Sequence, residues 1–404
     1  MRVSSINTAA LVLPAKRGGG KMALVIALVE WLGILLGFFP CGLLDPAWPR
    51  VKSVVGLLMA VVVLALCCAF TSSYLYYVSH GELWSGFTYM FAAMDKFFFS
   101  VLALTPYLVL VAWWAYHRGL ARHLRALKDL VAEGPPLPVL SFVLRISVVW
   151  ATFVADMIIL CYWYADVGDY ETYEPSANVV SLPFILTMHT FAICLVVSSF
   201  YVIEHKLSET NGEMKNMLSR KNPEENPPDP LARLRHFRTR LVYLRRMHRD
   251  LCHVSSVPLM ANNIMKFTGF VFMLFYILAY VHVWRFDFAL CTVSCLGNLA
   301  ALFVLGFVAD AVREKAEKPL RIISQAGPFD VESHLQAKFD REIYHIVELS
   351  KLPLTVEPIG LYVLSRSNIM TEPYPCEDLG KLRLTGHIRP FVPPCPDSER
   401  PDRG

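Results

Sequence analysis

The sequence predicts an all-α, polytopic helical membrane protein, a helical bundle with six membrane spans plus an N-terminal membrane-associated helix. Two observations carry this prediction. Of the 404 residues, 55% are hydrophobic and only 18% are charged, whereas soluble domains carry about 25% charged residues. The apolar residues also gather in runs of about 20, which is long enough for a helix to cross ~30 Å of hydrocarbon.

The apolar runs place the six spans at residues 54–78, 97–116, 139–165, 179–203, 264–283 and 288–309. Only residues 284–287 separate the last two runs, so these should form an antiparallel membrane hairpin. An earlier apolar run, residues 22–39, has Lys21 before it and Arg50 and Lys52 after it. Because basic residues on both sides keep both ends on one side of the membrane, we expect this run to lie against the inner leaflet without crossing it.

The connectors between the runs alternate in charge, and this alternation predicts the orientation. Residues 117–128 contain four Lys or Arg, residues 166–174 contain four acids and no Lys or Arg, and residues 206–249 contain eleven Lys or Arg against five acids. Connectors rich in Lys and Arg stay in the cytosol. The N-terminus, both basic connectors and the C-terminal region are therefore expected in the cytosol, an orientation opposite to that of G-protein-coupled receptors.

The chain divides into four expected parts. Residues 1–53 form the cytosolic N-terminus with its inner-leaflet helix, and residues 54–309 form the six-span bundle, including a basic cytosolic connector at 204–263. In the third part, 310–370, apolar residues recur every three or four positions among charges, which predicts a cytosolic amphipathic helix; these are Leu335, Phe339, Ile343 and Ile346. Residues 371–404 are rich in proline and charge, and we expect a disordered tail.

Three polar residues lie ten positions from the expected outer ends of their spans: Asp156, His189 and Asn298. At ~1.5 Å per residue they lie ~15 Å deep, near the bilayer midplane. Polar groups at that depth are costly unless they face one another or water. We hypothesise that they form, together with Thr187 and Thr190, the floor of a cavity that opens to the outside. The alternative is that they only link helices by hydrogen bonds.

Aromatic residues near the span ends would form the upper walls of this cavity. They are Phe97, Phe98, Phe99, Tyr162, Trp163, Tyr164, Tyr280, His282 and Trp284. Aromatic faces with a few hydrogen-bonding groups suit a small organic ligand, although Trp and Tyr are also ordinary anchors at the membrane interface. The ten cysteines fit no metal template, and no phosphate-binding loop or hydrolase motif occurs. We therefore expect no enzymatic activity, no metal, no cofactor and no nucleic-acid partner.

Several segments resemble the insect gustatory receptors. They are Leu36–Pro40, the basic segment Leu244–Cys252, the amphipathic stretch from Phe339 to Ile343, and Gly360–Arg366, in which Leu361 takes the place of the usual aromatic residue. The resemblance implies a ligand-gated cation channel of the plasma membrane that binds a small tastant and assembles as a tetramer with other gustatory receptor subunits. It also implies a seventh helix, where this chain has the proline-rich residues 371–404.

Two alternatives remain open from the sequence. A receptor without its seventh helix would act as a truncated regulatory subunit that dampens full-length partners. The other alternative is an unrelated six-span transporter. Transporters of this kind often carry internal repeats, and the first three spans show no correspondence with the last three.

Overall fold

The computed structural model describes the chain as a bundle of helices, and the described part contains no strand. The described residues, all within the unit Met1–Ile369, are 29–38, 49–80, 89–132, 137–167, 176–219, 230–280, 285–326, 333–360 and 363–365. The N-terminal residues 1–28 and the tail 371–404, on which two of the predictions fall, lie outside them. The division into four parts stays a prediction.

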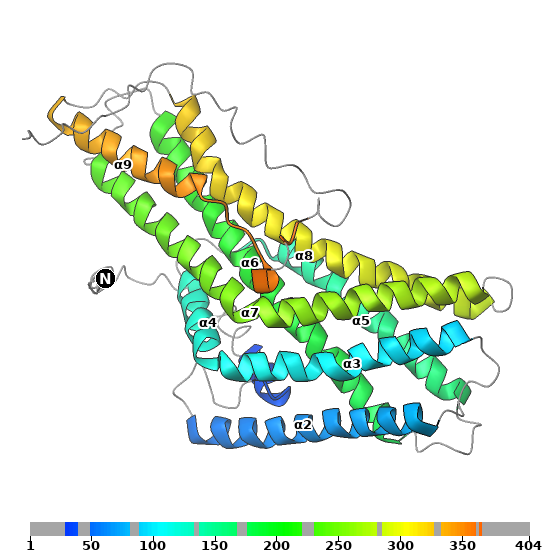
Figure 1. Cartoon of the computed structure of the whole chain (residues 1–404). Coiled ribbons are helices and arrows are strands. Elements are labelled where there is room, and N and C mark those ends of the chain that lie inside the picture. The colour runs from blue at the N-terminus through cyan, green and yellow to red at the C-terminus, as the bar shows by residue number, and fades with distance from the viewer. Residues whose placement is uncertain are drawn as a thin grey trace, which may run out of the picture. The chain divides into compact units, whose positions relative to one another are not determined.

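Six helices of this bundle are long and apolar enough to span a membrane, which confirms the predicted fold class. They are α2 (Pro49–His80), α3 (Tyr89–Ala115), α5 (Val139–Val167), α6 (Ser176–Ser219), α7 (Pro230–Tyr280) and α8 (Arg285–Gln325). Two further helices are shorter and have a higher proportion of charged residues: α4 (His117–Ala132) and α9 (Ser333–Lys351). A short 3₁₀ turn, η2 (Pro358–Gly360), follows α9. Figure 1 shows the arrangement of these elements.

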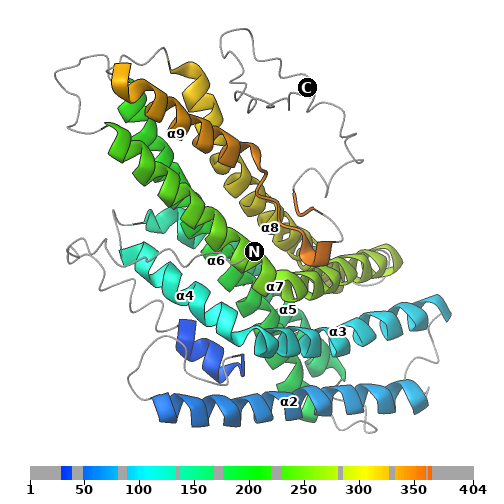
Figure 2. The ribbon, with the colours of Figure 1, turned by 60° about the vertical axis from the view of Figure 1, so that its left-hand side comes forward.

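Helix α7 is the centre of the bundle, because it packs against α8, α3, α6, α9, α4 and η2. Its ribbon and that of α8 run side by side to the end where the two helices are joined, as Figures 1 and 2 both show. This is the predicted antiparallel hairpin. We call this end of the bundle, where α7 ends and α8 begins, the hairpin end.

Three helices continue well past the predicted spans. The prediction ends the fourth span at residue 203, but α6 continues to Ser219, and α8 continues to Gln325 in place of residue 309. Helix α7 begins at Pro230, far before the predicted span at 264. Residues 204–219, 230–257 and 310–325 of these helices pack with α9 around one apolar core. We call these residues, together with α9, the stem.

The stem core contains the apolar face that the sequence predicts for residues 335–346. In α9, Phe339 and Ile346 are buried, and Ile343 packs against the same core. Charged groups bridge the helices around it. Glu342 of α9 pairs with Arg238 of α7 at 2.8 Å, and Arg240 of α7 pairs with Glu209 of α6 at 3.1 Å.

Arg245 of α7 fastens the chain that follows α9 to the rest of the stem. Its guanidinium Nη1 donates to the Leu352 carbonyl at 2.7 Å, and Nη2 donates to the Ala316 carbonyl of α8 at 3.4 Å. A charged donor to a carbonyl forms one of the stronger hydrogen bonds in proteins. The single residue Arg245 therefore holds three segments together.

The N-terminal residues 29–38 dock onto the bundle, and residues 29–35 are helical. Phe38 is fully buried, with its ring centroid 4.4 Å from that of Trp113 in α3 and 5.6 Å from that of Phe191 in α6. The indole Nε1 of Trp114 donates to the Gly37 carbonyl at 2.8 Å. Gly37 has a φ of 71°, a conformation that side chains with a Cβ disfavour. The segment is thus held by specific contacts with α3 and α6.

Candidate functional site

A cavity lies between five helices in the half of the bundle nearest the hairpin end. About 570 Å³ in and around it is not filled by atoms, a volume that includes space open to the surroundings. Most of its walls are apolar or aromatic, and its polar residues come from α5, α7 and α8. The lining residues are Phe98, Phe99, Leu102, Asp156, Ile159, Leu182, Leu186, Met265, Lys266, Gly269, Met273, Ser294 and Asn298.

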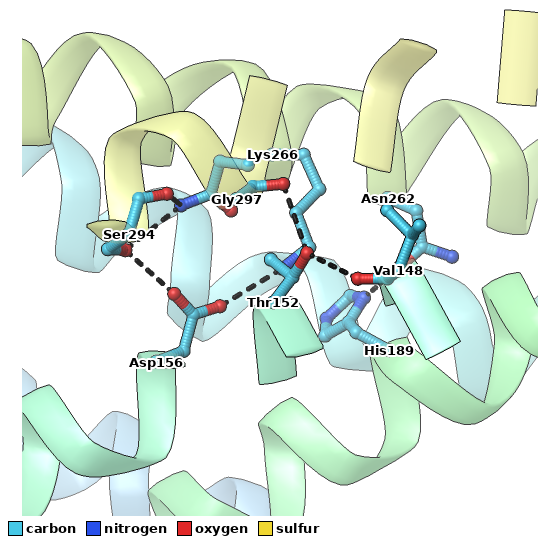
Figure 3. A network of polar contacts seen from close by, with 9 residues as sticks. Val148, Thr152, Asp156, His189, Asn262, Lys266, Ser294 and Gly297 are labelled. Carbon is cyan, nitrogen blue, oxygen red and sulfur yellow. Dashed lines mark hydrogen bonds and ion pairs between the residues drawn. The ribbon is translucent and has the colours of Figure 1, made fainter. Parts of the chain in front are cut away.

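An ion pair lies at one side of this cavity and joins three helices. The Nζ of Lys266 in α7 lies 3.1 Å from Oδ2 of Asp156 in α5. The other carboxylate oxygen of Asp156 accepts a hydrogen bond of 2.7 Å from the hydroxyl of Ser294 in α8. Figure 3 shows Asp156 between these two partners. Only 4% of the Lys266 side chain and 13% of the Asp156 side chain are exposed, so neither charge can rely on water.

Asn298 extends this network by one turn of α8. Its amide Nδ2 donates to the Ser294 carbonyl at 3.0 Å and lies 3.3 Å from the Ser294 hydroxyl. The opposite wall here is Gly269 of α7, where an added Cβ would lie only 3.3 Å from the Asn298 amide. The absence of a side chain at Gly269 therefore allows α7 and α8 to approach closely, as small residues do in membrane bundles.

A second close approach joins α5 to α8 beside the ion pair. The Thr152 hydroxyl lies 3.1 Å from the Gly297 carbonyl and 3.0 Å from the Val148 carbonyl (Figure 3). A Cβ added to Gly297 would lie 3.1 Å from the Thr152 methyl group. The cavity is thus bounded by helices whose spacing depends on two glycines.

His189 belongs to a different polar group, which links α6 to α3 and α7. Its Nδ1 lies 2.5 Å from the side-chain oxygen of Asn262, and its Nε2 lies 3.1 Å from the Thr105 hydroxyl. Because the amide oxygen accepts only, Nδ1 carries the proton and Nε2 accepts from Thr105. Both ring nitrogens of this buried residue are satisfied, and His189 is not among the residues that line the cavity.

The structure separates the polar residues that the sequence groups together. Asp156 and Asn298 line the cavity, whereas His189 does not. The Thr187 hydroxyl donates to the Pro183 carbonyl within its own helix at 2.8 Å, and Thr190 is buried outside the cavity lining. The assignment of these residues to ligand binding remains a proposal.

The predicted aromatic walls divide in the same way. Phe98 and Phe99 line the cavity, but Phe97 is 57% exposed on the outside of α3. Four predicted residues lie in α5 or α7 with side chains that the structure does not describe: Tyr162, Trp163, Tyr164 and Tyr280. His282 and Trp284 fall between α7 and α8, outside the described residues.

Sequence reasoning missed Lys266 and Ser294, which complete the polar side of the cavity. The signal for Lys266 was present, because it is the one Lys or Arg within the apolar run 264–283. A lysine inside one span requires a partner, and Asp156 inside another span is the complementary charge. No comparable signal identifies Ser294, since serine is common in membrane helices.

The fold is similar to that of two solved structures of one receptor. The insect olfactory receptor OR5 from Machilis hrabei in complex with eugenol matches with a TM-score of 0.64 and 12% identity, over 85% of this chain and 93% of that one. The structure of OR5 described without a ligand matches with a TM-score of 0.60 and 13% identity, with the same coverage. The comparison with curated proteins gave no match.

A family model supplies the assignment that the fold similarity alone does not. Residues 28–371 match the model described as 7tm chemosensory receptor. This match covers most of the chain and rules against the alternative of an unrelated six-span transporter. It agrees with the resemblance found in the sequence, and the olfactory receptor structures share the helical fold. The chain therefore belongs to the 7tm chemosensory receptor family.

Proposed function

We propose that the chain is a chemoreceptor subunit of the gustatory type, which binds a small organic tastant in the cavity and gates cation flux. The observation that carries this proposal is the cavity itself, with apolar and aromatic walls and a polar side formed by Asp156, Lys266, Ser294 and Asn298. Such a combination binds a small ligand by burying it and orients the ligand through a few polar groups.

The predicted orientation supports entry of the ligand from outside the cell. The cavity lies toward the hairpin end, and the basic connectors that mark the cytosolic side lie at the opposite end of the spans. In this proposal the protein is a multi-pass protein of the plasma membrane with a cytosolic N-terminus. It acts in a homo- or heterotetramer with other gustatory receptor subunits.

Two neighbouring phenylalanines provide the sharpest test. The chain is expressed, alone and with candidate partner subunits, in cells that report cation entry by a calcium-sensitive dye, and a panel of small organic compounds is applied. For a compound that evokes a response, Phe98→Ala removes a wall of the cavity and should raise the half-maximal concentration about tenfold or more. The matched control is Phe97→Ala, which removes the same side chain from the outside of α3.

The outcome is read against the amount of protein at the cell surface, measured by labelling of an epitope tag. An unchanged response in Phe98→Ala, or an equal change in both variants, contradicts ligand binding in this cavity. His189→Ala tests the polar group that does not line the cavity, because the His189 side chain lies outside the cavity lining. It should lower surface abundance and response together, as expected for a residue that links helices.

A further inference from the structure

Helix α4 differs from the spans in direction as well as in composition. It begins at His117, separated from the end of α3 at Ala115 by Tyr116 alone, and the chain changes direction between the two helices, most clearly in Figure 1. Its packing partners are α7, α3 and α6. One face of α4 is buried against them, with Leu120, Ala121, Leu124, Leu127 and Leu130.

The opposite face carries a row of basic side chains. Arg118, Arg122, Arg125 and Lys128 are all exposed and follow one another at intervals of four, three and three residues. This spacing keeps them on one side of the helix, along ~15 Å of its length. Asp129, the single acid of α4, is also exposed on this face, four residues after Arg125. Among the described residues, Arg118, Arg122 and Lys128 have no hydrogen-bond or ion-pair partner.

Helix α9, the amphipathic helix of the stem, provides a comparison for the charges of α4. Its charged side chains have both signs, and two contacts form within the helix: the Lys351–Glu348 ion pair at 2.7 Å and a hydrogen bond of 3.0 Å from the Gln336 amide to Asp340. A solvated face needs no single sign of charge. A topology signal needs a count of basic residues in the connector, but it does not need them on one face. Four basic side chains against one acid on this face of α4 are suited to a partner of negative charge.

The position of α4 identifies that partner. It lies at the end of the spans where α3 ends and α5 begins, which is the level at which hydrocarbon gives way to headgroups. An amphipathic helix inclined to the spans at this level places long basic side chains among lipid headgroups. The exposed Tyr116 at the turn between α3 and α4 is of the type that anchors helices at this interface.

We propose that the exposed row Arg118, Arg122, Arg125 and Lys128 is a binding surface for anionic phospholipid headgroups. The guanidinium groups bind phosphate oxygens in pairs of hydrogen bonds, and the lysine contributes a point charge. The docked apolar face of α4 fixes the direction of the row, so the surface is formed before any lipid arrives. This site does not depend on the proposed receptor function, because it lies on a different element from the cavity.

The test measures lipid binding to the full-length protein purified in detergent. The probe is a fluorescent short-chain phosphatidylinositol 4,5-bisphosphate, and its anisotropy reports binding. The variant Arg118→Gln, Arg122→Gln, Arg125→Gln, Lys128→Gln should weaken binding about tenfold or more, since each basic residue near a headgroup contributes to the attraction. Unlabelled phosphatidylserine should compete, phosphatidylcholine should not, and the free headgroup inositol trisphosphate should compete only weakly without its acyl chains.

The matched control removes four basic residues from exposed positions on α6, α7 and α9. It carries Lys215→Gln, Arg233→Gln, Lys338→Gln and Arg341→Gln, and it should bind the probe as the wild type does. Equal binding by wild type and α4 variant, or equal weakening by both variants, overturns the proposal. So does equal competition by free inositol trisphosphate or by an acidic peptide. If the α4 variant does not fold, Arg122→Gln alone must weaken binding, and wild-type binding must fall with rising salt; failure of either result also overturns it.

Discussion

Removal of one partner of the Asp156–Lys266 pair should destabilise the protein, and removal of both should restore most of the loss. In Asp156→Ala, the ammonium group of Lys266 stays in a side chain that is only 4% exposed and loses the carboxylate 3.1 Å away. Leaving a buried charge without its partner costs about 3–5 kcal/mol, whereas replacing both partners by apolar residues is often neutral. The double variant Asp156→Leu with Lys266→Met should therefore be far more stable than Asp156→Leu or Lys266→Met alone.

The magnitude can be converted to a thermal shift. With an unfolding entropy of roughly 2.1 cal/mol/K per residue, the single variants should melt on the order of 5 °C below the wild type. The assay is thermal unfolding of detergent-purified protein, followed by size-exclusion chromatography of a fluorescent fusion. A double variant that melts at the sum of the two single losses would refute the reasoning, because additive losses mean that the two residues do not interact. If the double variant is stable but no longer responds to ligand, the Asp156–Lys266 pair takes part in ligand recognition as well.

Three further substitutions test other parts of the structure by the same thermal assay or by proteolysis. Burial lowers the pKa of His123 in α4 from 6.5 to about 4. Between these pH values the unfolded chain binds more protons at this histidine than the folded chain does. The free energy of unfolding should therefore fall by about 3 kcal/mol through this residue as the pH is lowered from 6.5 to 4. His123→Leu should flatten this dependence, and an unchanged slope would contradict it. Gly37→Ala should cost about 1–2 kcal/mol or more, because φ is 71° and the new Cβ would lie 3.0 Å from a Val63 methyl group; an unchanged melting temperature would exclude this strain. Arg245→Met removes the donor to the Leu352 carbonyl, at a cost of about 1.5–3 kcal/mol in the free energy of unfolding. It should also speed proteolysis of the chain after α9. Cleavage at the wild-type rate would show that Arg245 does not hold this segment to the stem.

The sequence predicts the spans well because the hydrocarbon thickness imposes a minimum length on apolar runs. It does not predict where the helices end beyond the membrane. Helix α6 continues from 203 to Ser219 through charged residues, and nothing in a hydropathy pattern stops a helix whose polar turns remain solvated. Helix α4 was expected only as a basic connector, although its alternation of leucine and arginine is that of an amphipathic helix.

The sequence predicts how deep the site residues lie in the membrane, but it does not predict which way their side chains point. Counting residues from the span ends places Asp156, His189 and Asn298 at one level, yet successive residues of a helix point about 100° apart. His189 therefore faces Thr105 and Asn262, while Asp156 and Asn298 face the cavity. Rotation about the helix axis depends on packing against neighbours, which one sequence does not reveal.

Helix α7 connects the cavity and the stem through a single backbone. Lys266 at the cavity and Arg245 in the stem are 21 residues apart in one helix, or ~30 Å at 1.5 Å per residue. Pro258 lies between them, where a missing hydrogen bond makes a helix easier to bend. The ribbon of α7 changes direction along its length (Figure 1). Over ~30 Å, a small change in the bend of α7 at Pro258 becomes a sideways displacement of several ångströms at Arg245 relative to Lys266.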